Sequence, residues 1–248
     1  MKTNNPTLTE KVLQQFGSAG QVYAGERMTV EGTINRSALL LLLVVVPATW
    51  IWSQVMRGAV ADAYPWMIGG VIGGLIAAIV TIFKKEWAPV TAPVYAALEG
   101  LAIGGISAIL EAQYHGIVLQ AVALTFATMA TMLVAYRTGL IKVTDKFRFA
   151  VIGATAAIAL LYVVTMVLSL FHVTVPFVFG GGTAGIIFSL VVVAIAALNL
   201  ALDFDFIDQA VGVGAPKYVE WYAAFGLMVT LIWLYLEILR LLSNLRRR

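Results

Sequence analysis

The sequence has no cysteine and very little charge. Of its 248 residues, 16 are basic and 13 acidic, so charged side chains make up 12% of the chain, against about 25% in a soluble domain. Without cysteine there are no disulfide bonds, cysteine-ligated zinc, iron–sulfur clusters or thiol chemistry. The low charge and a hydrophobic share of 61% exclude a disordered protein, a coiled coil and an ordinary soluble enzyme domain. We therefore expect most of the chain to lie in lipid.

Motifs that indicate enzymes are also missing. The chain has no HExxH, GxSxG, Walker or dinucleotide-binding pattern in a suitable context. Its two histidines, His115 and His172, have no metal-ligand spacing. The net charge of +3 is typical of the basic inner loops of a membrane protein. We expect no enzymatic activity, no cofactor and no nucleic-acid partner.

Seven apolar stretches are long enough to cross a bilayer as helices, which takes about 20 residues each. They are Ser37–Met56, Tyr64–Phe83, Ala88–Leu110, Gly116–Tyr136, Phe149–Phe171, Thr183–Leu202 and Tyr218–Leu242. Short connections make neighbouring helices antiparallel. The sequence thus predicts an all-α membrane protein with a polar N-terminal arm (residues 1–36) and a seven-helix transmembrane domain (residues 37–245).

Basic residues in the short loops place the N-terminus in the cytoplasm. Lys84 and Lys85 follow the second stretch, and further cations lie between the fourth and fifth stretches: Arg137, Lys142, Lys146 and Arg148. Seven crossings then put the C-terminus outside, although the chain ends in three arginines. Either the earlier loops dominate, or the sixth or seventh stretch does not cross fully. We expect seven crossings, in a bacterial inner membrane.

Ionisable residues inside membrane stretches are functional candidates, because burying a charge in lipid is expensive. Asp203, Asp205 and Asp208 end the sixth stretch. If the helix continues, Asn199 and Asp203 share one face, whereas Asp205 and Asp208 share another. Carboxylate oxygens are the ligands that Ca²⁺ prefers, and a carboxylate held beside another can sense protons. The alternative is a solvated acidic helix end.

Two further acidic residues lie within predicted helices. Glu99 is near the middle of the third stretch. It must be neutral, paired or facing a wet cavity, so it either lines a functional interior or makes a structural hydrogen bond. Glu237 and Arg240 are three residues apart in the last stretch. They either pair locally, or Glu237 faces the acidic cluster with Arg240 as its counter-ion.

Several segments, taken in order, resemble bacterial members of the Bax inhibitor-1 family, in the transmembrane BAX inhibitor motif superfamily. These segments are Met28–Arg36, Ala92–Gly100, Tyr136–Arg148, Leu202–Ile207, Tyr218–Phe225 and Leu236–Ser243. The resemblance implies a bundle in which the last helix is central and wrapped by the other six. It also implies a pH-sensitive Ca²⁺ leak, a role in stress protection and, in one bacterial branch, modulation of a membrane protease.

In such relatives an acidic residue at the end of the sixth helix pairs with another in the seventh. The first falls best on Asp203, with Asp205 as the alternative. Thr230 stands where the second acid belongs, and threonine cannot titrate. Glu237 lies on the same face two turns later, about 10 Å along the helix, so the acid has either moved or is absent. The candidates for the neighbouring basic residue are Arg36, Arg57 and Arg240.

The leading hypothesis is therefore a membrane cation-homeostasis protein that leaks Ca²⁺. Its ion or proton would be bound by Asp203, Asp205 and Glu237, and the polar interior would be formed by Glu99, Asn199, Thr230 and Arg240. The alternative is a regulatory membrane protein that transports nothing and binds a membrane protease or another partner.

Overall fold

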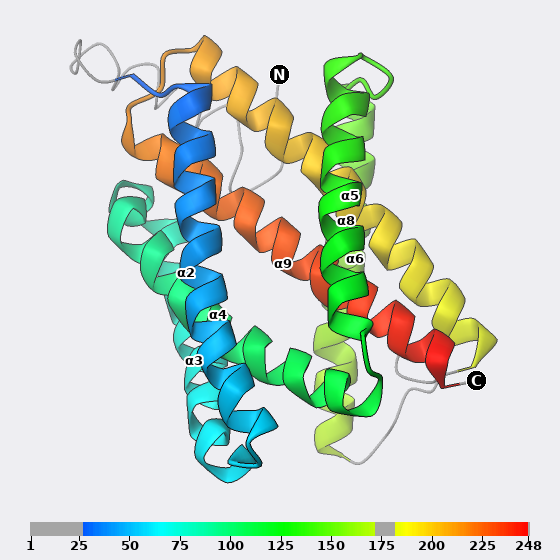
Figure 1. The fold of residues 1–248 in the computed structure, drawn as a ribbon. Helices are drawn as coiled ribbons and strands as arrows, with labels where there is room; N and C mark the ends of the chain where they lie inside the picture. Colours follow the sequence, from blue (N-terminus) through cyan, green and yellow to red (C-terminus); the bar gives the residue numbers. More distant parts are fainter. Residues whose placement is uncertain (1–26, 172–181, 248) are drawn as a thin grey trace. The chain divides into compact units, whose positions relative to one another are not determined.

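The computed structural model describes residues 27–171 and 182–247. They form α2 (Val30–Met56), α3 (Val60–Phe83), η1 (Lys85–Trp87), α4 (Ala88–Gln113), α5 (Ile117–Arg137), α6 (Asp145–Leu170), α8 (Thr183–Gly212) and α9 (Tyr218–Arg246) (Figure 1). Within this part of the chain seven helices are long and apolar enough to cross a membrane, and no strand is present. The predicted all-α, seven-helix membrane fold is confirmed.

The first membrane helix begins earlier than the sequence suggested. α2 starts at Val30, because the Thr29 side chain caps it by accepting a hydrogen bond from the Gly32 N–H at 2.9 Å. Such a cap satisfies one of the free N–H groups of a first helical turn. Residues 30–36, which were assigned to the polar arm, are therefore helical. Residues 1–26 of that arm lie outside the described residues, as does His172.

The sixth membrane helix continues beyond its apolar stretch, which ends at Leu202. α8 runs to Gly212, so Asp203, Asp205 and Asp208 lie inside the helix. The sequence left open whether the helix continues at this boundary, and the structure shows that it does. The chain turns instead at Gly214, whose positive φ of 67° suits glycine because it has no Cβ.

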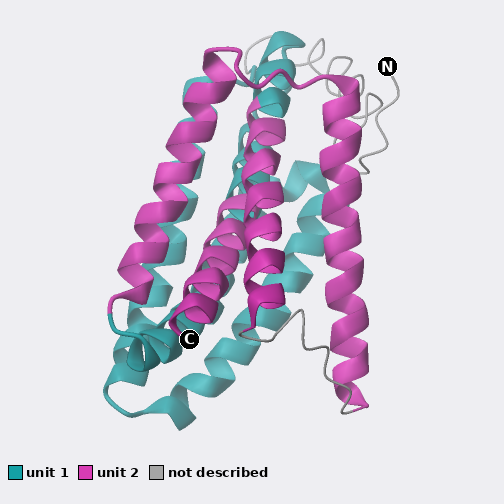
Figure 2. Ribbon diagram, turned by 90° about the vertical axis from the view of Figure 1, so that its right-hand side faces the viewer, with its two compact units in different colours: residues 1–115, 205–229 teal, residues 116–204, 230–248 magenta. Residues whose placement is uncertain are grey.

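The chain forms two compact units, coloured separately in Figure 2. Unit 1 consists of residues 1–115 and 205–229, and unit 2 of residues 116–204 and 230–248. Both α8 and α9 contribute one part to each unit. The predicted transmembrane domain, residues 37–245, thus contains parts of both units.

In unit 1, glycines let α4 approach its two neighbours closely. A Cβ at Gly100 or Gly104 would overlap the backbone of α2, at the carbonyls of Val44 and Ala48 respectively. A Cβ at Gly70 of α3 would sit 2.5 Å from the Leu98 carbonyl oxygen of α4. Membrane helices associate through such small-residue contacts. These glycines therefore serve the packing of α4 against α2 and α3.

One buried cluster in unit 1 joins five chain segments. It contains Met28 before α2, Ala88 at the start of α4, Ala210 near the end of α8, Ala215 in the following turn and Val219 at the start of α9. In a chain that crosses a membrane alternately, all these points belong on the same side. The packing of unit 1 therefore agrees with alternating crossings and with the start of α2 on the side of the α8–α9 turn.

In unit 2, the contacts at the C-terminal end of α9 also agree with alternating membrane crossings. Arg246 donates to the Gln120 Oε1 atom at 3.0 Å, and Asn244 donates to the Ser189 hydroxyl at 3.3 Å. The end of α9 thus lies beside the beginnings of α5 and α8. The basic α5–α6 connection is at the opposite end of α5, about 30 Å away for a helix of 21 residues. Within this unit α9 ends on the side opposite the basic loop.

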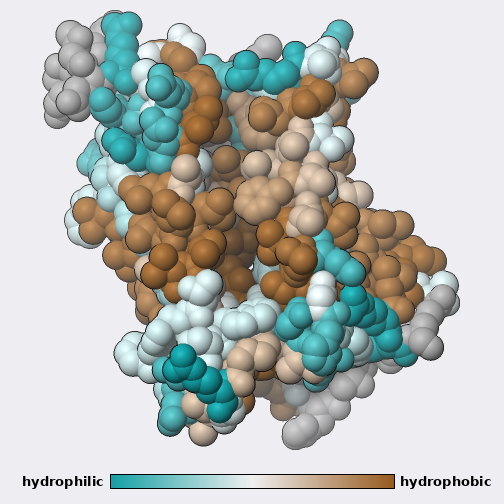
Figure 3. Space-filling model, viewed as in Figure 1, coloured by the Kyte–Doolittle hydropathy of each residue, from teal (hydrophilic) through white to brown (hydrophobic). Residues whose placement is uncertain are grey.

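Many large apolar side chains are exposed, as expected for helices that face lipid. Leu42 is 61% exposed, Leu75 61% and Leu119 76%. Hydrophobic residues cover much of the face drawn in Figure 3. Helices that are apolar on every side are buried in a large core or in a membrane, and here the exposed apolar residues indicate the membrane.

Candidate functional site

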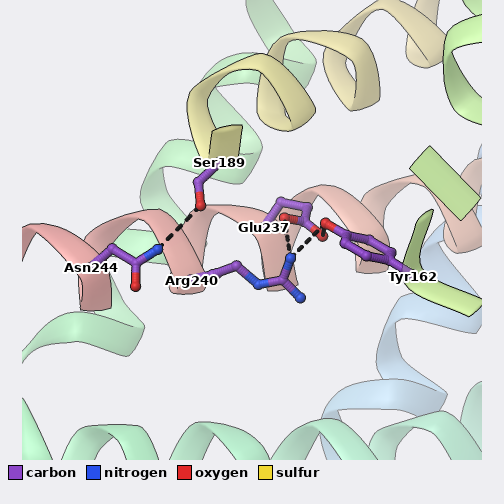
Figure 4. A network of polar contacts seen from close by, with 5 residues as sticks. All are labelled: Tyr162, Ser189, Glu237, Arg240 and Asn244. Atoms are coloured by element: carbon purple, nitrogen blue, oxygen red, sulfur yellow. Dashed lines mark hydrogen bonds and ion pairs between the residues drawn. The ribbon is translucent and has the colours of Figure 1, made fainter. Parts of the chain in front are cut away.

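Three polar side chains meet within the membrane-spanning part of unit 2 (Figure 4). Tyr162 of α6 donates its hydroxyl proton to Glu237 Oε1 of α9 at 2.9 Å. Arg240, one turn after Glu237, donates to the other carboxylate oxygen at 3.3 Å and to the Tyr162 oxygen at 2.5 Å. These contacts tie α6 to the second half of α9.

The network satisfies a carboxylate that lipid would otherwise penalise. Glu237 is only 2% exposed, and an ionised carboxylate tolerates such burial only with charged and hydrogen-bonding partners. Trp233, one turn earlier, is a further hydrogen-bond partner of Glu237. The Arg240 guanidinium also lies over the Tyr162 ring, 4.9 Å from its centre. Of the two interpretations of the Glu237–Arg240 pair, the local ion pair is the arrangement observed.

Asp203 is the second membrane-embedded carboxylate of unit 2. It has a side-chain hydrogen bond with Thr230 of α9, and Thr230 is itself buried, at 8% exposure. The Asp203 Oδ2 atom is buried and has no hydrogen-bond partner among the described residues. Thr230, which stands where the resemblance led us to expect a second acid, thus touches the predicted first acid.

Asn199 lies one turn before Asp203 on α8. Its side-chain amide donates to the Thr155 hydroxyl of α6 at 2.8 Å and to the Ile195 carbonyl, also at 2.8 Å. Asn199 therefore links α8 to α6, on the face that the sequence assigned to both Asn199 and Asp203.

The remaining predicted acids belong to unit 1. Asp205 accepts a hydrogen bond from the Gln209 amide at 2.6 Å, and Asp208 is exposed. The carboxylate of Glu99 lies against α3, where a Cβ at Gly74 would be 2.8 Å from Glu99 Oε2. Asp203 and Asp205 are two residues apart on one helix and so point to different sides.

The candidate basic residues have separate surroundings. Arg57 is exposed in the α2–α3 turn. Arg36 is partly buried in unit 1, with its guanidinium 4.8 Å from the Trp221 ring centre. In unit 2 it is Arg240 that contacts a predicted acid.

The described part of the chain holds no group of three or more His, Asp or Glu side chains that could bind a metal ion.

Comparison with known proteins identifies the family. The family model described as Bax inhibitor 1 like matches residues 5–247. The chain belongs to the Bax inhibitor 1-like family. No curated protein and no solved structure gave a match. The resemblance seen in the sequence is thus confirmed over nearly the whole chain.

Sequence reasoning about this Bax inhibitor 1-like chain missed several polar residues. Tyr162 was one, although a single tyrosine in the middle of an apolar stretch is a signal that could have been used. Glu220 was another: it is only 1% exposed and accepts hydrogen bonds from the backbone N–H and the hydroxyl of Thr29, both at 3.1 Å. Its partner Thr29 is 191 residues away in the sequence, so no local pattern pointed to it.

Proposed function

We propose that this member of the Bax inhibitor 1-like family is a Ca²⁺-permeable leak of the membrane whose opening depends on pH. The observation that carries the proposal is the buried Oδ2 atom of Asp203 inside a membrane-spanning helix, which has no hydrogen-bond partner in the part of the chain that the structure describes. An acid retained in that position is costly and so points to function. Carboxylate oxygen is also the ligand type that Ca²⁺ prefers.

In this proposal Asp203 contacts the passing ion. Thr230 holds the carboxylate on one side, which leaves Oδ2 for a cation or a proton. A single carboxylate supplemented by water binds Ca²⁺ weakly, and an ion that is to pass must not be held tightly. The ion is cargo here and not a resident part of the protein.

The Tyr162–Glu237–Arg240 network acts as the closure. It joins α6 to α9 through one carboxylate that serves both Tyr162 and Arg240. Protonation of Glu237 would remove the charge that holds Arg240. The protonated carboxyl group would also donate a hydrogen bond, which the carboxylate cannot do. A proton shifts the equilibrium between the closed and open arrangements only if it binds to one of them more tightly than to the other.

The proposal is tested by Ca²⁺ flux into dye-loaded proteoliposomes at acidic and neutral pH. Asp203→Asn should change both the size and the pH dependence of the flux. The matched control is Asp208→Asn, the same chemical change at an exposed position of the same helix, which should behave like the wild type. Two results overturn the proposal: no flux above that of empty liposomes at any pH, or an unchanged pH profile in both Asp203→Asn and Asp205→Asn.

We also propose that the protein lies in a bacterial inner membrane with its N-terminus in the cytoplasm. The basic residues between α5 and α6 support this orientation. So does the packing of the start of α2 with the α8–α9 turn.

A further inference from the structure

Two segments that are far apart in the sequence meet in unit 1 and leave two buried atoms unsatisfied. Three buried side-chain polar atoms have no hydrogen-bond partner in the described residues. Two of them, Arg36 Nε of α2 and Glu220 Oε2 of α9, belong to this meeting point. Native structures leave few such groups, and each one calls for an explanation.

Glu220 is held at the beginning of α2. Its Oε1 atom accepts hydrogen bonds from the backbone N–H and the hydroxyl of Thr29, the residue that caps α2. A carboxylate is favoured there because the N-terminus of a helix carries a partial positive charge. Gly32 provides the space, since a Cβ at that position would overlap the carboxylate. Half of the carboxylate is therefore well bound, and the other oxygen is not.

Arg36 lies against the same turn of α9. It is one helical turn after Gly32, and its guanidinium is 4.8 Å from the ring centre of Trp221, the residue that follows Glu220. No ion pair joins Arg36 to Glu220 among the contacts of the described residues. A buried donor and a buried acceptor of opposite charge thus lie at the same turn of α9, and within the described residues neither atom has a hydrogen-bond partner.

We propose that Arg36 and Glu220 are the two halves of a switchable ion pair that holds the start of α9 to α2. In the arrangement observed, Arg36 stacks on Trp221 while Glu220 binds Thr29. In the other arrangement, Arg36 Nε–H donates to Glu220 Oε2 and the carboxylate leaves Thr29. The second arrangement exchanges the stacked cation and the two Thr29 hydrogen bonds for one charge-assisted hydrogen bond. The observed arrangement is therefore the more stable one, and the other is its minor partner.

The ion pair gives a role to the segment Met28–Arg36, which takes no part in the proposed leak. It is a conformational device at the end of unit 1 where α2 and α9 begin. The device depends neither on Ca²⁺ nor on Asp203, so it can be tested without measuring Ca²⁺ flux.

The test is amide hydrogen exchange at Thr29 in the full-length protein in detergent. Trp221→Leu removes the ring on which Arg36 stacks and should release Arg36 toward Glu220. The Thr29 N–H would then lose its acceptor and exchange about fivefold faster, the shift expected from losing one cation–π contact. Adding Arg36→Met to this variant should restore slow exchange, because no guanidinium is left to draw the carboxylate away.

Two comparisons make the test specific. Trp66→Leu, an exposed tryptophan elsewhere in unit 1, should leave exchange at Thr29 unchanged. Arg36→Met alone should leave it as slow as in the wild type. Equal exchange rates in Trp221→Leu and in Trp221→Leu/Arg36→Met would overturn the proposal, because Trp221 would then act by packing alone. Unchanged exchange in Trp221→Leu would overturn it as well.

Discussion

Asp203 and Glu237, both in unit 2, differ in how completely their oxygens are paired. Glu237 has Tyr162, Trp233 and Arg240 as partners. Asp203 has Thr230, and its other, buried oxygen has no hydrogen-bond partner among the described residues. A satisfied buried carboxylate fixes a structure, and an unsatisfied one gains from a new partner. For this reason we assign the closure to Glu237 and ion contact to Asp203 in the proposed mechanism.

Tyr162→Phe should destabilise the protein through the loss of one hydroxyl. That hydroxyl donates to Glu237 and accepts from Arg240, so its removal leaves a buried carboxylate with one donor fewer. We expect a loss of about 1–3 kcal/mol in the free energy of unfolding, measured by denaturant unfolding in detergent. Tyr64→Phe, at a tyrosine that is 59% exposed, is the control and should have no measurable effect.

Arg240→Met should be more harmful than the double variant Arg240→Met/Glu237→Gln. The single change leaves Glu237 buried with its charge uncompensated, and the second change removes that charge. We expect the single variant to lose about 2 kcal/mol, less than for a fully buried pair because the Arg240 side chain is 29% exposed. A double variant that unfolds at a lower temperature than Arg240→Met would contradict this, because Glu237 would then carry no costly uncompensated charge in the single variant.

At the scale of elements, close approach and helix length decide how the membrane helices are placed. α4 contacts α2 through glycines that face backbone carbonyls. α8 continues through its acids to Gly212, which keeps Asp203 on the face of Asn199. The sequence predicted this shared face only if the helix continued past Leu202, and the structure shows that it does.

Gly104→Ala should destabilise unit 1, because its Cβ would overlap the Ala48 backbone of α2. Overpacking of this kind costs about 1–3 kcal/mol. Gly69→Ala is the matched control on α3, since a Cβ there meets no atom within 4 Å. That substitution should be neutral or slightly stabilising, as alanine favours helix. Equal melting temperatures for the two variants would contradict the close approach of α2 and α4.

At the scale of the whole molecule, successive helices cross the membrane in opposite directions, and this decides which helix ends lie on the same side of it. In unit 1 the start of α2 packs with the α8–α9 turn. In unit 2 the end of α9 lies beside the start of α5. Within unit 2 this contact leaves Arg246 at the end of α5 opposite the basic α5–α6 connection.

This topology predicts a labelling pattern that the absence of cysteine makes simple to measure. For the proposed inner-membrane location and orientation, a membrane-impermeant maleimide should label Gln113→Cys and a cysteine added after Arg248 in cells whose outer membrane is permeabilised. It should label Lys142→Cys only after the inner membrane is opened. A C-terminal cysteine protected like Lys142→Cys would mean that the chain does not complete its seventh crossing.

The sequence by itself determined the fold class, the family and the residues worth attention. Long apolar runs can only be membrane helices, and acids within them stand out because lipid penalises charge. Only the tertiary structure decided the partners. Tyr162 and Glu237 are 75 residues apart and Thr29 and Glu220 are 191 apart, and no local periodicity links such pairs. Helix ends also depended on packing and capping, since Thr29 starts α2 and Gly214 ends the turn after α8 regardless of where the apolar run stops.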